Sequence, residues 1–150
     1  MTLSKAYNFI QVNELISSSG TLMHIDLQSL SNEDYHAVIN LLPDDNQHAT
    51  KDEQKTLEAL GLNYTYIPVD WDAPTTSDFT EFESAMISNK GKKIHIHCAA
   101  NFRATAFYGI YACKHLNWST EQVLAFTTPI WQIEDYPIWS NFVDQLTHQA

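Results

Sequence analysis

Residues 92–107 read KKIHIHCAANFRATAF, and this stretch decides the fold. The apolar run that ends at Cys98 is typical of a buried strand, and the apolar pattern that follows Arg103 is typical of a helix. A short turn joins the two. The N–H groups at a helix N-terminus have no acceptor inside the helix and carry the positive end of its dipole, so they stabilise an anion. The stretch therefore predicts an anion-binding turn that contains a thiol.

Strands and helices alternate on both sides of this turn. Periodicity and turn residues predict helices that begin near residues 27, 50, 76, 104, 119 and 137, and buried strands at 35–42, 62–69 and 92–98. The alternation predicts an α/β fold, a three-layer sandwich in which a mainly parallel sheet of about four to five strands lies between helices. Ligands of such sheets bind beyond the carboxyl ends of the strands, where Asp70, Asp72 and Cys98 all fall.

Weaker local signals add three expectations. Residues 17–20 predict a turn, which a short strand at 21–25 follows. Thr50 is expected to cap the helix at 50–60, with Glu53 as its capping-box partner. A solvated surface is expected for the acidic residues Asp44, Asp45, Asp52 and Glu53.

Composition bounds the class of protein. The chain has 150 residues, of which 44% are hydrophobic, and we expect one domain that spans residues 1–150. Lys and Arg number 8 against 18 Asp and Glu, and the net charge of −10 argues against nucleic-acid binding and against attachment to an anionic membrane. No basic stretch followed by an apolar core opens the chain, so we expect a cytoplasmic protein and leave a processed periplasmic form open. Cys98 and Cys113 fit free thiols in a reducing compartment.

The turn carries the residues of a nucleophilic site. A free thiol is only a few per cent ionised at neutral pH, so Cys98 needs charge-assisted hydrogen bonds from the loop amides and Arg103 to act as a nucleophile. The planar fork of Arg103 also grips two oxygens of an oxyanion. Asn101 lies where the turn needs a positive φ, which asparagine tolerates. His97 is expected to orient the loop by hydrogen bonding, and His95 to be a satisfied core residue.

The segment from His97 to Arg103 resembles the signature loop of the cysteine-dependent phosphatases, the protein tyrosine and dual-specificity phosphatase superfamily. More narrowly, the chain resembles small bacterial phosphatase-like proteins related to the fused domain of beta-lactamase-hydrolase-like proteins. The resemblance implies a phosphatase-like fold and hydrolysis of a phosphate monoester, on a small molecule or a protein, through a phosphocysteine at Cys98. It implies that Arg103 holds the phosphoryl oxygens and that an aspartate of a separate loop protonates the leaving group. It implies no cofactor, and the 7 histidines lack the tight spacing of a metal site.

Two departures from the signature leave alternatives open. The phosphatase signature has five residues between cysteine and arginine, whereas this chain has four, the spacing that resembles rhodanese sulfurtransferases. Ala104 stands where Ser or Thr is common, and Thr105 is the candidate to replace it. The expected anion-binding residues are Ala99, Ala100, Asn101, Phe102, Arg103 and Thr105.

The function and the general acid therefore have alternatives. The two alternatives to a phosphatase are a sulfurtransferase that carries a persulfide on Cys98 and a catalytically silent module that binds an anion or a partner. The general acid is Asp72 or Asp70, and we prefer Asp72 because it lies further into the loop. The physiological substrate and the oligomeric state are not predicted.

Overall fold

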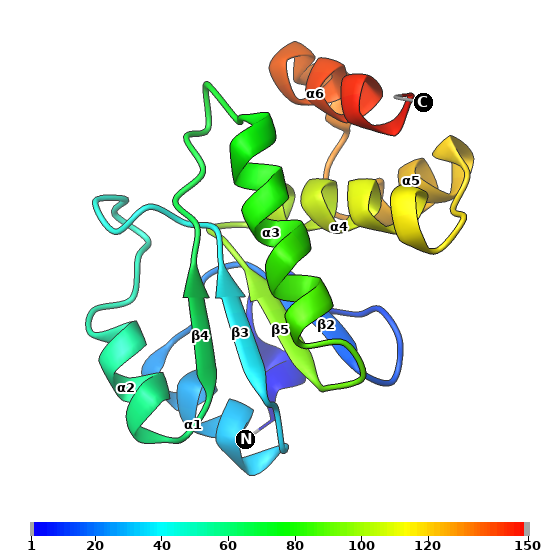
Figure 1. Ribbon diagram of the computed structural model, residues 1–150. Coiled ribbons are helices and arrows are strands. Elements are labelled where there is room, and N and C mark those ends of the chain that lie inside the picture. Colours follow the sequence, from blue (N-terminus) through cyan, green and yellow to red (C-terminus); the bar gives the residue numbers. More distant parts are fainter. Residues whose placement is uncertain (1, 149–150) are drawn as a thin grey trace.

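A five-stranded sheet lies between helices in the computed structural model, which describes residues 2–148 (Figure 1). The strand order is β1-β2-β5-β3-β4, and only the β1–β2 pair is antiparallel. The strands are β1 (Ile10–Gln11), β2 (Ile16–Ser19), β3 (Ala37–Asn40), β4 (Asn63–Tyr66) and β5 (Ile94–His97). This arrangement confirms the predicted α/β fold with a mainly parallel sheet.

The helices divide into two groups, each with its own core. On one face are the short 3-10 helix η1 (Leu3–Lys5), α1 (His24–Asn32) and α2 (Glu53–Ala59). The other group comprises α3 (Thr76–Ser88), α4 (Phe102–His115), α5 (Thr120–Thr127), the 3-10 helix η2 (Ile133–Asp135) and α6 (Pro137–Thr147). Side chains of a strand point alternately to the two faces. Val38 accordingly belongs to the α1–α2 core, and Ile39 to the α3–α6 core.

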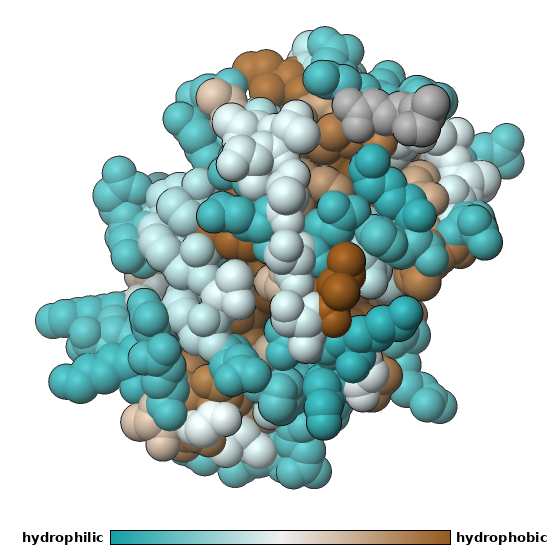
Figure 2. Space-filling view, viewed as in Figure 1, coloured by the Kyte–Doolittle hydropathy of each residue, from teal (hydrophilic) through white to brown (hydrophobic). Residues whose placement is uncertain are grey.

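Several predicted helix boundaries are confirmed. Ser119 caps α5 through a capping box with Gln122, and Pro137 begins α6. The predicted start of a helix near residue 76 is confirmed, and the residue that caps this helix, α3, is Thr75, with Asp78 as its capping-box partner. No helix within residues 2–148 is both long and apolar enough to cross a lipid bilayer. The face seen in Figure 2 is mostly hydrophilic and is broken by small, separate hydrophobic patches.

Three local predictions are wrong. Residues 17–19 belong to the buried strand β2 rather than to a turn, and residues 21–25 run into α1 rather than forming a strand. Thr50 does not cap α2, because Asp52 precedes that helix with φ 59° and the Thr50 hydroxyl donates to the carbonyl of Leu22. Serine is typical of turns because its hydroxyl needs a partner, and in β2 distant side chains supply partners to Ser17 and Ser19, whereas Ser18 Oγ is buried without one within residues 2–148.

Candidate active site

Cys98 directly follows the last residue of β5, and Phe102 begins α4. Asn101 lies between them with φ 71° and ψ 10°, so the predicted positive φ is confirmed. The Cys98 side chain is fully buried at the base of the loop, and Arg103 is 6% exposed. The strand, the turn and the helix thus bring the predicted thiol and guanidinium into one buried loop.

The backbone N–H groups of residues 99–104 donate to no acceptor within residues 2–148. The first amide that donates to a carbonyl is that of Thr105, whose N lies 3.1 Å from the oxygen of Asn101. A helix leaves its first N–H groups unpaired, and the tight turn before α4 extends that run of free donors. The loop therefore offers a row of donors, with the positive end of a helix dipole behind it, to an anion.

The N-terminal third of the chain holds this loop from the side. Asn101 donates from Nδ2 to the carbonyl of Asn8 (2.8 Å), and Asn8 donates from Nδ2 to the carbonyl of Ala100 (3.0 Å). A Cβ on Gly20 would lie 2.5 Å from the carbonyl oxygen of Ala99, so only glycine lets the chain come this close. Sequence reasoning missed Asn8 because it lies 93 residues from Asn101 and belongs to no local motif.

Arg103 is held in a fixed orientation by the segment that follows β4. Its Nε donates to the carbonyl of Val69 at 2.9 Å, and its Cζ lies 5.2 Å from the centre of the Trp71 ring. Burial lowers the pKa of Arg103, while the neighbouring Cys98, Asp70 and Asp72 act in the opposite direction. The guanidinium also interacts with the Cys98 side chain, so Arg103 is placed to stabilise both the thiolate and the oxygens of a bound anion.

The two candidate acids lie on the loop between β4 and α3. Asp70 accepts a hydrogen bond at Oδ1 from the amide of Asp72 (2.9 Å), and both side chains are exposed. Trp71 anchors this loop, because its carbonyl accepts from Trp139 Nε1 (2.8 Å) and its ring stacks on the Trp139 ring at 5.3 Å. Its ring also contacts those of Phe102, Trp131 and Tyr136. The aromatic cluster thus holds the acidic loop against the start of α4.

Thr105 is fully buried, and its hydroxyl is engaged inside the protein. Its Oγ1 donates to the carbonyl of Asn101 (2.7 Å) and accepts from Trp131 Nε1 (3.0 Å). The structure therefore places this residue behind the loop, where it ties the first turn of α4 to Trp131.

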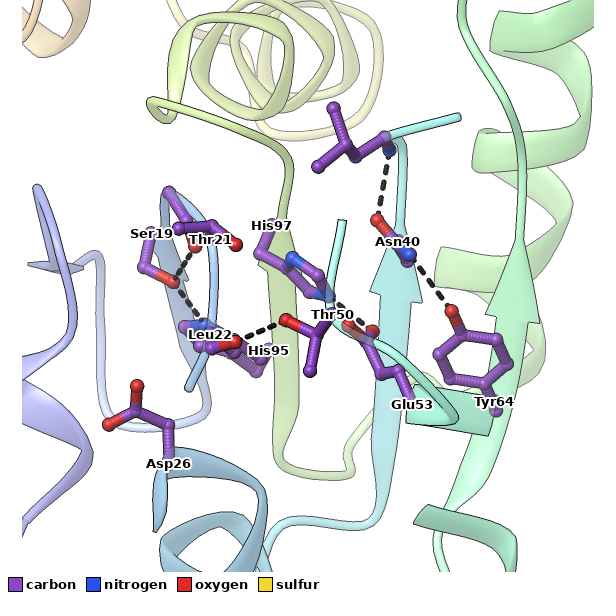
Figure 3. Close-up of polar contacts among 12 residues, drawn as sticks. Ser19, Thr21, Leu22, Asp26, Asn40, Thr50, Glu53, Tyr64, His95 and His97 are labelled. Atoms are coloured by element: carbon purple, nitrogen blue, oxygen red, sulfur yellow. Dashed lines mark hydrogen bonds and ion pairs between the residues drawn. The ribbon is translucent and has the colours of Figure 1, made fainter. Parts of the chain in front are cut away.

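Two buried histidines lie on the α1–α2 side of β5 (Figure 3). His95 bonds Ser17 Oγ through Nδ1 (2.7 Å) and Ser19 Oγ through Nε2 (2.8 Å), which confirms a satisfied core histidine. Because Ser19 donates to the carbonyl of Gly20, it accepts from His95, and the proton of His95 lies on Nε2. Burial, and then the electrostatic influence of the neighbouring His97 ring, hold the pKa of His95 well below its usual value of 6.5.

His97 bonds Glu53 of α2, with 2.6 Å between Nε2 and Oε2, and both residues are buried. The expectation that Glu53 belongs to a solvated surface is therefore wrong, whereas Asp44, Asp45 and Asp52 are exposed as predicted. A lone glutamate in an acidic stretch gives no sequence signal for a histidine 44 residues away. Within residues 2–148 no group of three or more His, Cys, Asp or Glu side chains is placed to hold a metal ion.

Comparison with known proteins places this geometry in a family. A candidate phosphatase (DUF442) from Shewanella putrefaciens CN-32 is 32% identical, with a TM-score of 0.87 over 97% of this chain and 92% of that chain. The chain belongs to the DUF442 family. No family model matches the sequence of the present chain.

Two further known proteins also resemble the present chain. The solved structure of Tk-PTP is 18% identical, with a TM-score of 0.79 over 95% of this chain and 98% of that chain, a likeness that shows the fold alone. That fold is the cysteine-based protein tyrosine phosphatase type, as the sequence predicts. A beta-lactamase hydrolase-like protein from Agrobacterium fabrum is 29% identical over 102 residues, which are 66% of this chain and 23% of that protein. The present chain thus spans only about a quarter of the length of this relative.

Proposed function

We propose that this DUF442 chain is a cysteine-dependent phosphatase that hydrolyses a phosphate monoester through a phosphocysteine on Cys98. The observation that carries the proposal is a single loop that unites a buried thiol, the unpaired amides of residues 99–104 and the buried guanidinium of Arg103 beside the thiol. The amides and Arg103 bind the phosphoryl oxygens, and no metal or other cofactor takes part. The phosphorylated substrate is a small molecule or a protein.

In the first step the Cys98 thiolate attacks phosphorus, and the bond from phosphorus to the leaving oxygen breaks. The leaving oxygen takes a proton from the carboxyl group of Asp72, which becomes a carboxylate. Charge spreads over the equatorial oxygens in the transition state, where the amides and Arg103 stabilise it. The removal of one such donor costs roughly 10²–10³ in rate, and a general acid contributes roughly 10²–10⁴.

In the second step water attacks the phosphorus of the phosphocysteine. The Asp72 carboxylate takes a proton from the attacking water, and the phosphorus–sulfur bond breaks. Inorganic phosphate and the Cys98 thiolate result, and the protonated Asp72 is ready for another turnover. Each group therefore returns to its starting state without an external oxidant or reductant.

Hydrogen bonding supports Asp72 over Asp70 as the acid. The Asp70 carboxylate already bonds the amide of Asp72 and so shapes the loop, whereas the Asp72 carboxylate has no such partner within residues 2–148. Electrostatics point the other way, since Asp70 affects the pKa of Arg103 more than Asp72 does. We give the hydrogen bond more weight, because a proton donor must be free to reach the leaving oxygen.

A sulfurtransferase is the second candidate, which the short spacing between Cys98 and Arg103 favours. In this reaction the Cys98 thiolate attacks the outer sulfur of thiosulfate, the sulfur–sulfur bond breaks and sulfite leaves. Cyanide then takes the outer sulfur from the Cys98 persulfide as thiocyanate and restores the thiolate. This route uses the same anion-binding loop and needs no acid.

Assays on the purified chain separate these functions. A phosphatase releases phosphate from p-nitrophenyl phosphate, loses this activity in Cys98→Ser, and loses far more activity in Asp72→Asn than in Asp70→Asn. A sulfurtransferase forms thiocyanate and shows a persulfide mass on Cys98 after thiosulfate treatment. Phosphatase activity that survives Cys98→Ser contradicts the proposal. An anion that binds without either reaction indicates the silent module.

A further inference from the structure

Glu53 is a buried carboxylate at the start of α2, on the face of the sheet opposite to α4. It is 5% exposed, and its Oε2 lies 2.6 Å from Nε2 of His97, which is 1% exposed. Figure 3 shows the two side chains pointing toward one another from α2 and β5. A buried charge without a partner is strongly destabilising, so each of these residues depends on the other.

The contact fixes which ring nitrogen of His97 faces Glu53. When Glu53 is a carboxylate, which only accepts hydrogen bonds, the hydrogen that joins the pair lies on Nε2 of His97. The other ring nitrogen, Nδ1, is buried and has no partner within residues 2–148. Glu53 is thus the only described hydrogen-bond partner of the His97 side chain.

The orientation of His97 bears directly on the nucleophile. His97 is the last residue of β5, and the backbone of the next residue, Cys98, donates to the carbonyl of Ser19 at 3.3 Å. The Glu53 segment also contacts the chain that supports the loop. Thr21 donates from its hydroxyl to the carbonyl of His48 and from its amide to the carbonyl of Ala99. The segment of residues 48–53 therefore supports the Cys98 loop at two points, through the bond of Glu53 to His97 and through the bond of Thr21 to His48.

We propose that Glu53 is a positioning residue of the Cys98 loop. By bonding Nε2 it holds the His97 ring in one tautomer and one orientation, and the backbone at His97 then sets the direction of the Cys98 side chain. Glu53 also neighbours Tyr64, but it reaches the loop through His97, whose backbone leads directly into Cys98. The catalytic consequence rests on the proposed function, in which Cys98 is the nucleophile.

The test compares Glu53→Ala and Glu53→Gln with Glu58→Gln, a matched control on the exposed part of the same helix. Glutamine keeps a hydrogen-bond acceptor for Nε2 and removes the charge, whereas alanine removes both. Three experiments are made on the folded proteins: the ¹⁵N spectrum of His97, the rate at which iodoacetamide alkylates Cys98, and steady-state kinetics with p-nitrophenyl phosphate, which give kcat and KM. Peptide mass spectrometry follows Cys98, with Cys113 as the internal reference.

We expect Glu53→Ala to lose the Nε2–H signature of His97, to slow alkylation of Cys98 and to lower kcat roughly tenfold to hundredfold with little change in KM. Glu53→Gln should keep the Nε2–H tautomer and stay within about threefold of the wild type, because orientation rather than charge is the role. Glu58→Gln should match the wild type.

Two results overturn the proposal: an unchanged ¹⁵N spectrum with unchanged alkylation in Glu53→Ala, or a Glu53→Gln protein that is as slow as Glu53→Ala. If Glu53→Ala does not fold, Glu53→Gln decides alone, and a His97 proton on Nδ1 in that variant overturns the proposal. The spectrum and the alkylation rate need no substrate. They therefore test Glu53 even if the wild type proves inactive, a result that counts against the proposed function only.

Discussion

The two faces of β5 differ in chemistry, although they belong to the same four residues. Ile94 and Ile96 belong to the α3–α6 core, where rings such as Phe82 and Phe107 fill the space. His95 and His97 point to the α1–α2 side, where hydroxyls and a carboxylate bond them. Burial of apolar surface stabilises the first face without regard to direction, whereas hydrogen bonds on the second face work only in one geometry.

This difference suggests a division of labour around Cys98. The apolar face provides most of the stability, and the polar face sets the orientation of the loop that follows β5. Substitutions on the first face should therefore change stability more than rate. Substitutions on the polar face should change the catalytic rate, or the pH dependence of stability, more than their loss of unfolding free energy alone would explain.

The largest effect on stability is expected from Phe82→Ala on the apolar face. Phe82 is fully buried on α3 and its ring packs against Phe79, Phe107 and Tyr111. The truncation should lower the free energy of unfolding by about 3–5 kcal/mol, because it removes apolar contacts and leaves a cavity. Urea unfolding measures the loss, and the activity of the folded fraction should stay at the wild-type level. A fall in that activity would show that the apolar face also orients the loop.

The pH dependence of stability tests the polar face. Because burial holds the pKa of His95 below 6.5, the unfolded chain binds a proton near this pH that the folded chain does not. Stability is therefore fully present above about pH 6.5 and falls as the pH drops toward the folded pKa, by at most about 1.4 kcal/mol per pH unit. Urea unfolding between pH 7 and pH 5 should show a smaller slope in His95→Gln. The control His36→Gln, at an exposed histidine, should keep the wild-type slope.

The same contrast explains which features the sequence predicts. The strand, turn and helix around Cys98, the positive φ of Asn101 and the cap at Ser119 follow from the local sequence, and each is confirmed in the structure. The contacts that support the loop join distant segments, as between Glu53 and His97 or between Asn8 and Ala100. A polar side chain shows which bonds it needs but not where they come from, so these partners become visible only in the fold.

Gly20→Ala should disturb the loop from its N-terminal side. The new Cβ would meet backbone atoms, at 2.5 Å from the Ala99 oxygen and 3.0 Å from the Ala100 Cα, so the loop itself must move. We expect a loss of about 1–3 kcal/mol in unfolding free energy and a large fall in the activity of the folded protein. Gly109→Ala is the matched control on the apolar face, where the Cβ would lie 2.8 Å from a methyl group of Val123. It should lose comparable stability and keep its activity, and equal falls in activity would contradict the division of labour.

The smallest effect is expected from Trp139→Phe, which tests whether one hydrogen bond of the apolar face also orients the site. Trp139 donates from Nε1 to the carbonyl of Trp71, the anchor of the loop that carries Asp72. Phenylalanine keeps an aromatic ring, but it loses the donor and leaves a small cavity where the larger buried indole lay, which together should cost about 1–2 kcal/mol in unfolding free energy. If this bond holds the acidic loop in place, kcat should fall several-fold with little change in KM, because acid catalysis depends on the position of Asp72. Trp118→Phe, at a half-buried tryptophan that packs against Tyr108 and Phe126, serves as the control and should leave kcat unchanged. An unchanged kcat in Trp139→Phe would mean that ring stacking alone holds Trp71, and the orienting contacts would then lie entirely on the polar face.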